Sequence, residues 1–120
     1  MTGHSLRIKR VYEAPASTDG YRVLVDRLWP RGLTRERAEL DLWLKDVAPS
    51  AELRTWFGHD PARFLAFSER YRTELADNPA VAELREAIQS HPTTTLLFAA
   101  HDPEVNHAVV LRDFLDGQGP

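Results

Sequence analysis

Apolar residues gather in three short stretches of the chain, and the pattern within each stretch predicts a β-strand. Residues 23–25 and 94–100 are apolar or β-branched without alternation, which is typical of central strands that are covered on both faces. Residues 6–12 mix apolar and basic side chains in near alternation and therefore predict a strand with one wetter face. Residues 42–45 are ambiguous, because they fit either a short strand or the end of a helix that begins near Thr34.

The helices are predicted by their first residues. Asp or Asn followed by Pro supplies a capping oxygen and a backbone preset for the first helical turn, and this pair occurs three times. The pairs predict helices that start at Asp60, Asn78 and Asp102. A fourth helix is expected after Ser50, with this serine as its cap. The second helix in chain order has an apolar stripe at helical spacing, formed by Phe64, Phe67, Tyr71 and Leu75.

Buried strands that alternate with amphipathic helices predict the α/β fold class, with mostly parallel pairing because the crossovers are helical. We expect a single three-layer domain with a mostly parallel sheet of about 3–5 strands flanked by helices. The sequence has no repeat, low-complexity tract or linker, so the domain should span residues 1–120 with an ordered core of about residues 6–116. Ligands of such sheets bind beyond the carboxyl ends of the strands, where polar residues are therefore of most interest.

Composition narrows the chemistry. The 120 residues include no cysteine, which excludes disulfides, thiolate metal sites, iron–sulfur clusters and nucleophilic thiols. No apolar run is long enough for a signal peptide or a membrane span, so we expect a cytoplasmic protein without membrane contact. The net charge is −3, but residues 1–37 carry +4 and residues 38–120 carry −7. Any tendency to bind anions should therefore reside in the basic N-terminal third.

The first candidate site is the loop that follows residues 23–25. It contains Asp26, Arg27 and Arg31, and its WPRG turn at residues 29–32 is stiffened by proline, which also holds Trp29 extended. Guanidinium groups match carboxylate and phosphate oxygens, and a rigid loop loses less entropy when it grips them. We therefore predict an anion clamp of Arg27 and Arg31, with Asp26 orienting the arginines or a water. The structural alternative is that Asp26 pairs with an arginine or caps a helix and that Trp29 belongs to the core.

The second candidate group follows residues 94–100 and consists of His101, Asp102, Asn106 and His107. His107 is the predicted acid–base group, with Asp26 as a tentative catalytic partner. Asp102 is most simply the cap of the last helix, because its carboxylate suits the free N–H groups of a helix start. The site requires that the two groups of residues, which are far apart in the chain, converge at one rim.

Other chemistries have weaker support. Ser50 could complete a hydrolase triad with His and Asp, but no Gly-x-Ser-x-Gly elbow surrounds it. A metal site of Asp26, His101, Asp102 and His107 lacks the dense His–Glu spacings of zinc and iron helices. Walker and Gly-x-Gly-x-x-Gly loops are absent from the sequence, so it offers no dedicated nucleotide site. We therefore expect neither a metal nor a cofactor. The helical aromatics, including Phe57 and Phe67, are expected in the core.

Four segments in order carry a resemblance to a known family: DRLWPRG at residues 26–32, WLKDVAPS at 43–50, LRTWFGHDPARF at 53–64 and AAHDPEVNHAVVL at 99–111. Together they resemble the YeaO-like branch of the family named domain of unknown function 488. The resemblance implies a small single-domain intracellular α/β protein without an established activity. The resemblance implies that this branch holds Asp26, Arg27, Trp29, Arg31, Lys45, Ser50, Asp102, Asn106 and His107, so Lys45 and Ser50 join the expected ligand-binding set. A similar sister branch has cysteines near residues 98–100 and 106, so any thiol or metal chemistry there would be lost in this chain.

Two functions follow as hypotheses. The leading one is a site that binds or turns over a small anionic ligand at the carboxyl ends of the strands. The alternative is a non-catalytic module that contacts a protein or nucleic acid through Trp29 and basic residues of the N-terminal third, namely Arg7, Lys9, Arg10 and Arg35. The acidic total weighs against a nucleic-acid partner without removing it.

Overall fold

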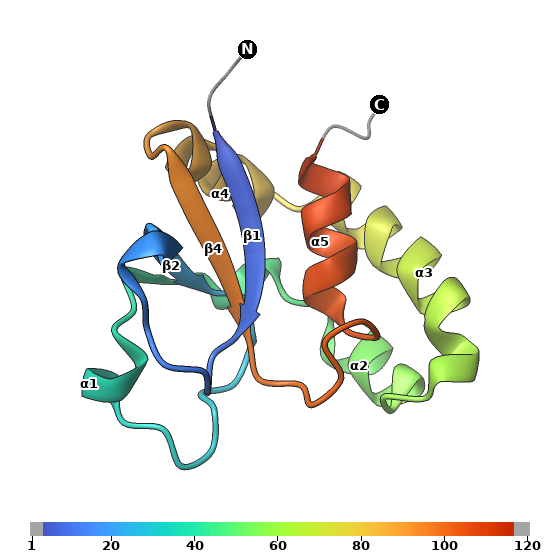
Figure 1. Ribbon diagram of the computed structural model, residues 1–120. Coiled ribbons are helices and arrows are strands. Elements are labelled where there is room, and N and C mark those ends of the chain that lie inside the picture. The colour runs from blue at the N-terminus through green and yellow to red at the C-terminus, as the bar shows by residue number, and fades with distance from the viewer. Residues whose placement is uncertain (1–3, 117–120) are drawn as a thin grey trace.

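The computed structural model describes residues 4–116 and contains a four-stranded parallel sheet (Figure 1). Its strands are β1 (Ser5–Arg10), β2 (Tyr21–Leu24), β3 (Leu42–Trp43) and β4 (Thr93–Phe98), in the spatial order β1-β4-β2-β3. The predicted α/β class and its parallel sheet are confirmed. The ends of the predicted domain, residues 1–3 and 117–120, lie outside the described residues.

Five α-helices and three short 3₁₀ helices accompany these strands in residues 4–116. The α-helices are α1 (Arg35–Ala38), α2 (Ala51–Phe57), α3 (Phe64–Ala76), α4 (Ala80–Gln89) and α5 (His107–Leu115). The 3₁₀ helices are η1 (Ser17–Asp19), η2 (Lys45–Val47) and η3 (Pro61–Arg63). Of the ambiguous residues 42–45, the first two form β3 and the last begins η2. A search of this part of the chain found no helix with the length and apolar character that a membrane crossing needs.

The two strands predicted to be central are the two inner strands. β4 pairs with β1 on one side and with β2 on the other, where Val23 lies opposite Leu96. The pairing continues beyond the end of β2, because the Val25 N–H donates to the Leu97 carbonyl at 3.0 Å. Since all pairs are parallel, the loops after β2 and β4 leave the sheet at the same edge.

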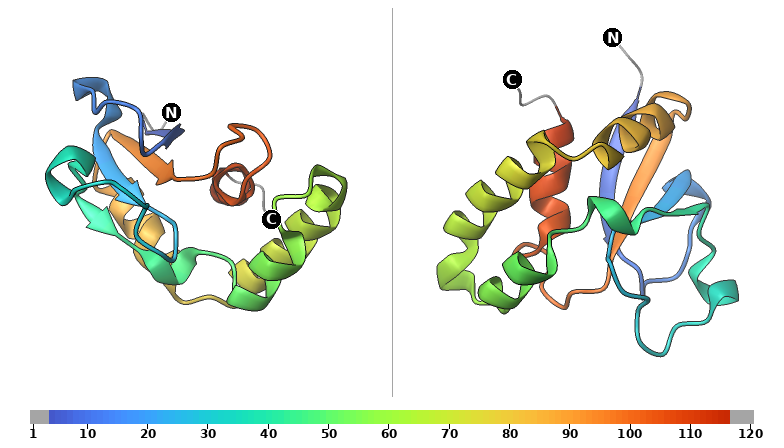
Figure 2. Two further views of the ribbon diagram at one scale, coloured as in Figure 1. Left: turned by 90° about the horizontal axis from the view of Figure 1, so that it is seen from below. Right: turned by 180° about the vertical axis from the view of Figure 1, so that it is seen from behind.

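Helices α2, α3, α4 and α5 lie on one side of the sheet (Figure 2). Their buried side chains form one cluster with Val23, Leu96 and Phe98 of the inner strands. The predicted stripe of α3 is confirmed, because Phe67 and Tyr71 are almost fully buried in this cluster together with Leu75. The packing of these helices on the strands places the end of α2 and the start of α5 at the carboxyl edge of the sheet.

The opposite face of the sheet is covered by the chain between β2 and β3, which contains the single-turn helix α1 (Figure 2). Here Leu24 and Leu97 are fully buried against Trp29 and Trp43. The two indoles meet edge to face with ring centroids 5.4 Å apart. The loop predicted as a candidate site is therefore also a structural layer of the domain.

A buried ion cluster lies beside the start of β2. The Asp19 carboxylate accepts hydrogen bonds from Lys9 Nζ at 3.0 Å and from Arg22 Nη1 at 2.5 Å, and Asp19 is only 4% exposed. Burial by itself would raise the pKa of Asp19, but hydrogen bonds from the Ala16 N–H, Lys9 and Arg22 outweigh it and lower the pKa below 3.8. Two of the basic residues counted in the N-terminal third are thus paired with one carboxylate inside the domain.

Three of the four predicted helix starts are confirmed. Ser50 caps α2 by accepting a hydrogen bond from the Leu53 N–H at 3.1 Å. Asp60 caps η3, which runs directly into α3, by accepting from the Ala62 N–H at 3.0 Å. Asn78 accepts from the Ala80 N–H at 2.9 Å at the start of α4.

The predicted start of the last helix at Asp102 is wrong. α5 begins at His107, and Asn106 is its cap, with Oδ1 accepting from the Val109 N–H at 3.1 Å. Asp102 instead accepts from the N–H groups of Glu104 and Val105 at 2.8 and 3.1 Å and stabilises a separate turn. An Asp-Pro pair can satisfy one turn without starting a helix, and here the helix begins only where Ala108 and Leu111 become buried against the core.

Candidate functional site

A cavity of about 510 Å³ lies beyond the carboxyl ends of β2 and β4. Its lining comes from several separate segments: Tyr12 after β1, residues 26–31 after β2, residues 48–49 before α2, Arg54, Phe57 and His59 in and after α2, Phe67 of α3, and residues 99, 100, 106 and 107 after β4. The predicted convergence is therefore confirmed for the loop after β2 with Asn106 and His107, whereas His101 and Asp102 do not line this cavity. The cavity occupies the edge at which parallel sheets usually bind ligands.

Asp26 joins the two inner strands at this edge. Its Oδ2 accepts a hydrogen bond from the Ala99 N–H at 3.0 Å, which ties the end of β2 to the chain after β4. Its Oδ1 lies 3.2 Å from Nε2 of His107 but is buried and makes no hydrogen bond of good geometry. The Asp26 side chain is thus positioned mainly by its hydrogen bond from the Ala99 backbone.

His107 reaches the same point from the first turn of α5. Its Nε2 lies 3.1 Å from the Val25 carbonyl oxygen, and since a carbonyl only accepts, Nε2 is the nitrogen that carries a proton. The imidazole also meets the Tyr71 ring edge to face, with centroids 6.2 Å apart. Proton exchange with a ligand would therefore depend on the other nitrogen, Nδ1.

Arg27 is partly used inside the protein. Its Nη2 donates to the Ala48 carbonyl at 3.3 Å, and its Nη1 lies 3.9 Å from the exposed carboxylate of Asp46. The Nε–H is buried and has no partner among the described residues. Arg27 therefore adds positive charge to the cavity wall and leaves one donor unsatisfied.

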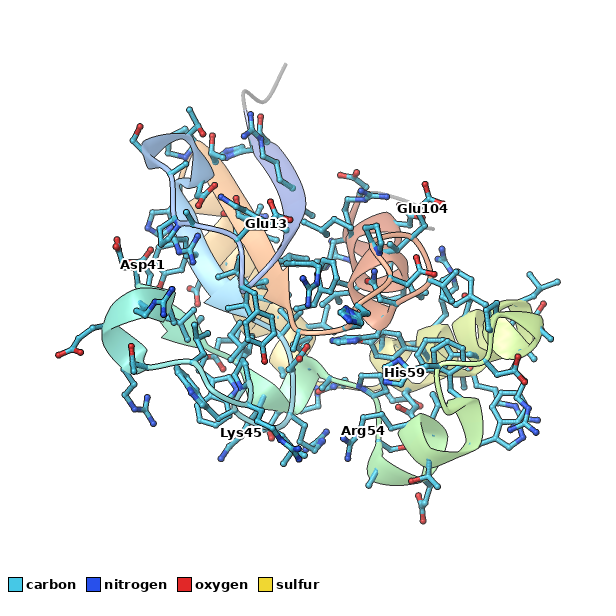
Figure 3. All side chains as sticks on the ribbon, turned by 60° about the horizontal axis from the view of Figure 1, so that its bottom comes forward. Glu13, Asp41, Lys45, Arg54, His59 and Glu104 are labelled. Atoms are coloured by element: carbon cyan, nitrogen blue, oxygen red, sulfur yellow. The ribbon has the colours of Figure 1, made fainter. Side chains whose placement is uncertain are left out.

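The freer cations stand at the mouth of the cavity. Arg31 and Arg54 are exposed, and no carboxylate of residues 4–116 lies within ion-pair distance of either guanidinium. His59 follows α2 in a left-handed conformation with φ of 58°, directly after Gly58 with φ of 55°. Figure 3 shows Arg54 and His59 together at this end of the molecule. The left-handed turn fixes where His59 stands at the rim.

Trp29 lines the cavity but is also anchored. Its indole N–H donates to the Leu33 carbonyl at 2.6 Å, and the guanidinium of Arg35 lies over the ring at 4.6 Å. Together with the contact to Trp43, these interactions hold the loop rigid. The functional and the structural interpretation of this tryptophan are therefore both consistent with its position.

Three residues expected in the ligand-binding set have other surroundings. Lys45 lies over the Trp43 ring at 5.1 Å and does not line the cavity. Ser50 also lies outside the lining, since its hydroxyl caps α2 and donates to Glu74 Oε2 at 2.7 Å. Asp102 borders an adjoining, more open hollow together with His101. Asn106 does line the main cavity, but both ends of its amide are engaged, in the cap of α5 and with the Asp102 carbonyl.

The charges around the cavity are predominantly positive. Arg27, Arg31 and Arg54 face one carboxylate, that of Asp26, among its lining residues. Within residues 4–116 no three His, Asp or Glu side chains lie close enough together to hold a metal ion. The donor set therefore matches an anion better than a cation.

Several lining residues were missed by sequence reasoning. Phe57 and Phe67 were expected in the core, and each is at once buried and part of the cavity floor. Arg54 and His59 carried no prediction. The signal that could have found Arg54 is its position three residues before Phe57, which places both on one face of α2.

Comparison with known proteins gives a family. A family described as "Inactive DUF488-N3 subclade" matches residues 5–118. An uncharacterized protein of Mycobacterium tuberculosis (strain H37Rv) is 44% identical over 113 residues, which cover 94% of this chain and 95% of that protein. The uncharacterized protein YeaO of Escherichia coli (strain K12) is 40% identical over 111 residues, covering 92% of this chain and 96% of YeaO. No solved structure matches the chain.

The fold and the site therefore belong to a small parallel α/β protein with a cationic cavity at the carboxyl edge of its sheet. The chain is a member of the DUF488 family, and its relatives include YeaO. The resemblance noted from four sequence segments is confirmed over nearly the whole chain.

Proposed function

We propose that the cavity binds a small anionic ligand. The observation that carries this proposal is the presence of Arg31 and Arg54, exposed and without ion-pair partners in residues 4–116, on the border of one cavity. Unpaired guanidinium groups on one cavity offer forked, charge-assisted hydrogen bonds to a bound anion. Arg27 adds a third positive charge and a buried Nε–H that has no acceptor in the described part of the chain.

The proposal is for binding rather than turnover. Asp26 and His107, the two residues expected to carry acid–base chemistry, are both engaged by the backbone through Ala99 and Val25. The family description, which calls the subclade inactive, agrees with this preference.

We also propose a cytoplasmic location for the protein, which cell fractionation tests.

Single charge removals test the anion site. We expect Arg31→Gln and Arg54→Gln each to weaken the binding of inorganic phosphate, sulfate or small carboxylates by about tenfold or more, because each removes a charged donor. Isothermal titration calorimetry at low salt measures the change. Arg37→Gln is the matched control, since Arg37 is an exposed arginine of α1 outside the cavity lining. Equal affinity in all four proteins, or no binding of any anion to the wild type, would contradict the proposal.

A second candidate is the non-catalytic module that contacts a protein or nucleic acid. Its supporting observation is that Arg31, Arg35 and Arg37 are all exposed on the segment that covers one face of the sheet. The support is weaker than for the cavity, because Lys9 pairs with Asp19 and Arg10 donates to the carbonyls of residues 99 and 100. Salt separates the candidates, since nucleic-acid binding through these arginines should weaken steeply with ionic strength.

A further inference from the structure

The cavity is divided into an apolar interior and a charged mouth. Phe57 and Phe67 on its floor are 4% and 1% exposed, whereas Arg31, Arg54 and His59 at its mouth are exposed. A bare inorganic anion would occupy only the mouth. A volume of about 510 Å³ falls in the range of pockets that enclose whole organic molecules.

Two polar side chains of the interior are engaged by the protein, and the two interior polar atoms without a hydrogen-bond partner among residues 4–116, Asp26 Oδ1 and Arg27 Nε, are themselves buried. The Asn106 amide donates to the Asp102 carbonyl and accepts from the Val109 N–H, and Nε2 of His107 is engaged by the Val25 carbonyl. A polar ligand body would therefore find few free partners and would lose hydrogen bonds to water on entry. The part of a ligand that enters the cavity should accordingly be apolar.

The apolar surface is aromatic on the helix side. The rings of Phe57 and Phe67, which both line the cavity, are stacked with centroids 4.2 Å apart, and Phe64 supports Phe57 from outside the lining at 6.0 Å. A further ring placed on such a series gains contact energy beyond its burial. On the opposite rim stands Leu28, which is 65% exposed and lines the cavity. A ring that enters the cavity would cover part of this leucine.

We infer that the ligand is an aromatic acid, with its ring inside the cavity and its phosphate or carboxylate at the mouth between Arg31 and Arg54. This inference rests on the proposed function, because it names the class of anion that the site takes. The mouth recognises the charge and the floor recognises the ring. The two halves of the ligand therefore contribute separately to the binding free energy.

Matched small molecules test the two halves. The probes are phenyl phosphate, cyclohexyl phosphate and inorganic phosphate, with benzoate, cyclohexanecarboxylate and acetate as the carboxylate series. We expect the better of the two aromatic acids to bind the wild-type protein about tenfold or more tightly than the corresponding bare anion, because its ring buries apolar area. It should also bind more tightly than its cyclohexyl analogue, and comparison of the two series shows which anionic group the mouth prefers.

Two exposed leucines provide a matched pair of variants. Leu28→Ser removes the apolar side chain at the rim and should weaken the binding of the aromatic acid about threefold or more. It should leave the affinity for the bare anion unchanged. Leu65→Ser makes the same change at a leucine that is 76% exposed on α3 and outside the cavity lining, and should change neither affinity. Because both leucines are exposed, both variants should fold.

The outcomes are distinct. Bare anions that bind as tightly as the aromatic acids would overturn this inference and leave the anion site standing. Cyclohexyl acids that bind as tightly as their aromatic analogues would overturn the preference for an aromatic ring over a saturated one. An effect of Leu65→Ser equal to that of Leu28→Ser would place the ligand elsewhere. Absence of binding by every probe would overturn the proposed function and this inference with it.

Discussion

Asp26 is the residue that most directly connects fold and site. It follows a central strand, and its carboxylate receives the Ala99 N–H from the neighbouring strand's exit loop at 3.0 Å while Oδ1 faces the His107 imidazole at 3.2 Å. The sequence suggested either a catalytic carboxylate or an ion pair with a nearby arginine. The observed partners are a backbone amide and a histidine, so the first task of Asp26 is to hold two loops together at the cavity.

Replacing this carboxylate should destabilise the fold. In Asp26→Ala the half-buried Ala99 N–H loses its acceptor, and we expect the free energy of unfolding to fall by about 1–3 kcal/mol. Urea denaturation near neutral pH measures the loss. The control is Asp46→Ala, because the Asp46 side chain is 77% exposed and its removal should change stability by less than about 0.5 kcal/mol. Similar losses in the two variants would show that the Asp26 carboxylate does not stabilise the contact between the two loops.

At the scale of elements, α3 is fastened to the chain that leads into α2. The Tyr71 hydroxyl donates to the Val47 carbonyl of η2 at 2.6 Å, and Tyr71 is fully buried. Burial raises the pKa of Tyr71 well above 10.0, and the negative charges of Glu74 and Asp26 raise it further, although Arg27 acts in the opposite direction. The position of Phe67, which lines the cavity from α3, depends on this attachment.

The raised pKa of Tyr71 predicts a loss of stability in alkali. Above the ordinary value of 10.0 the unfolded chain releases the tyrosine proton and the folded chain does not, so the free energy of unfolding should fall with rising pH. Tyr71→Phe removes this contribution, and its stability should decline less steeply over the same range. At neutral pH the variant should lose about 1–3 kcal/mol, because the Val47 carbonyl is left unpaired. Urea unfolding, monitored by circular dichroism over this pH range, measures both stabilities. Equal declines in the free energy of unfolding for wild type and variant would contradict the assignment of the decline to Tyr71.

At the scale of the whole molecule, the ion cluster around Asp19 links distant parts of the sheet. Lys9 comes from β1, Arg22 from β2, and the Thr95 hydroxyl of β4 donates to the Asp19 carbonyl at 2.7 Å. Arg22 also donates to the Ala38 carbonyl at the end of α1. The Asp19 carboxylate therefore joins β1 to β2, its backbone carbonyl adds β4, and Arg22 extends the cluster to α1.

This cluster predicts how the domain responds to acid. The folded pKa of Asp19 is lowered, so its contribution is complete above the ordinary value of 3.8 and is lost as the pH falls through the folded pKa. In Asp19→Asn, two cations lose their buried partner, and we expect a loss of about 3–5 kcal/mol near neutral pH with a smaller further loss in acid. Urea denaturation at several pH values down to about pH 2 tests this.

The control for the acid experiment is Asp77→Asn. Asp77 is exposed after α3, and its replacement should leave both the stability and its pH dependence nearly unchanged. If Asp19→Asn kept the acid dependence of the wild type, the cluster would not be the source of that dependence.

Much of the fold was predictable because it depends on short-range patterns. Runs without alternation identified the inner strands at residues 23–25 and 94–100, and the capping residues Ser50, Asp60 and Asn78 marked helix starts. Asp102 failed as a helix start because an Asp-Pro turn is locally satisfied whether or not a helix follows. Local chemistry predicts the turn, and burial of the following residues determines the helix.

The sequence by itself determined the α/β class, the parallel pairing and the polar residues that leave the inner strands, since strand and helix periods and strand ends are properties of neighbouring residues. Only the tertiary structure decided that Arg54, His59 and Phe57 join Arg31 at one cavity while Lys45 and Ser50 remain outside it. The physical reason is that these contacts depend on how α2 and α3 pack on the sheet, and packing is set by side chains far apart in the chain.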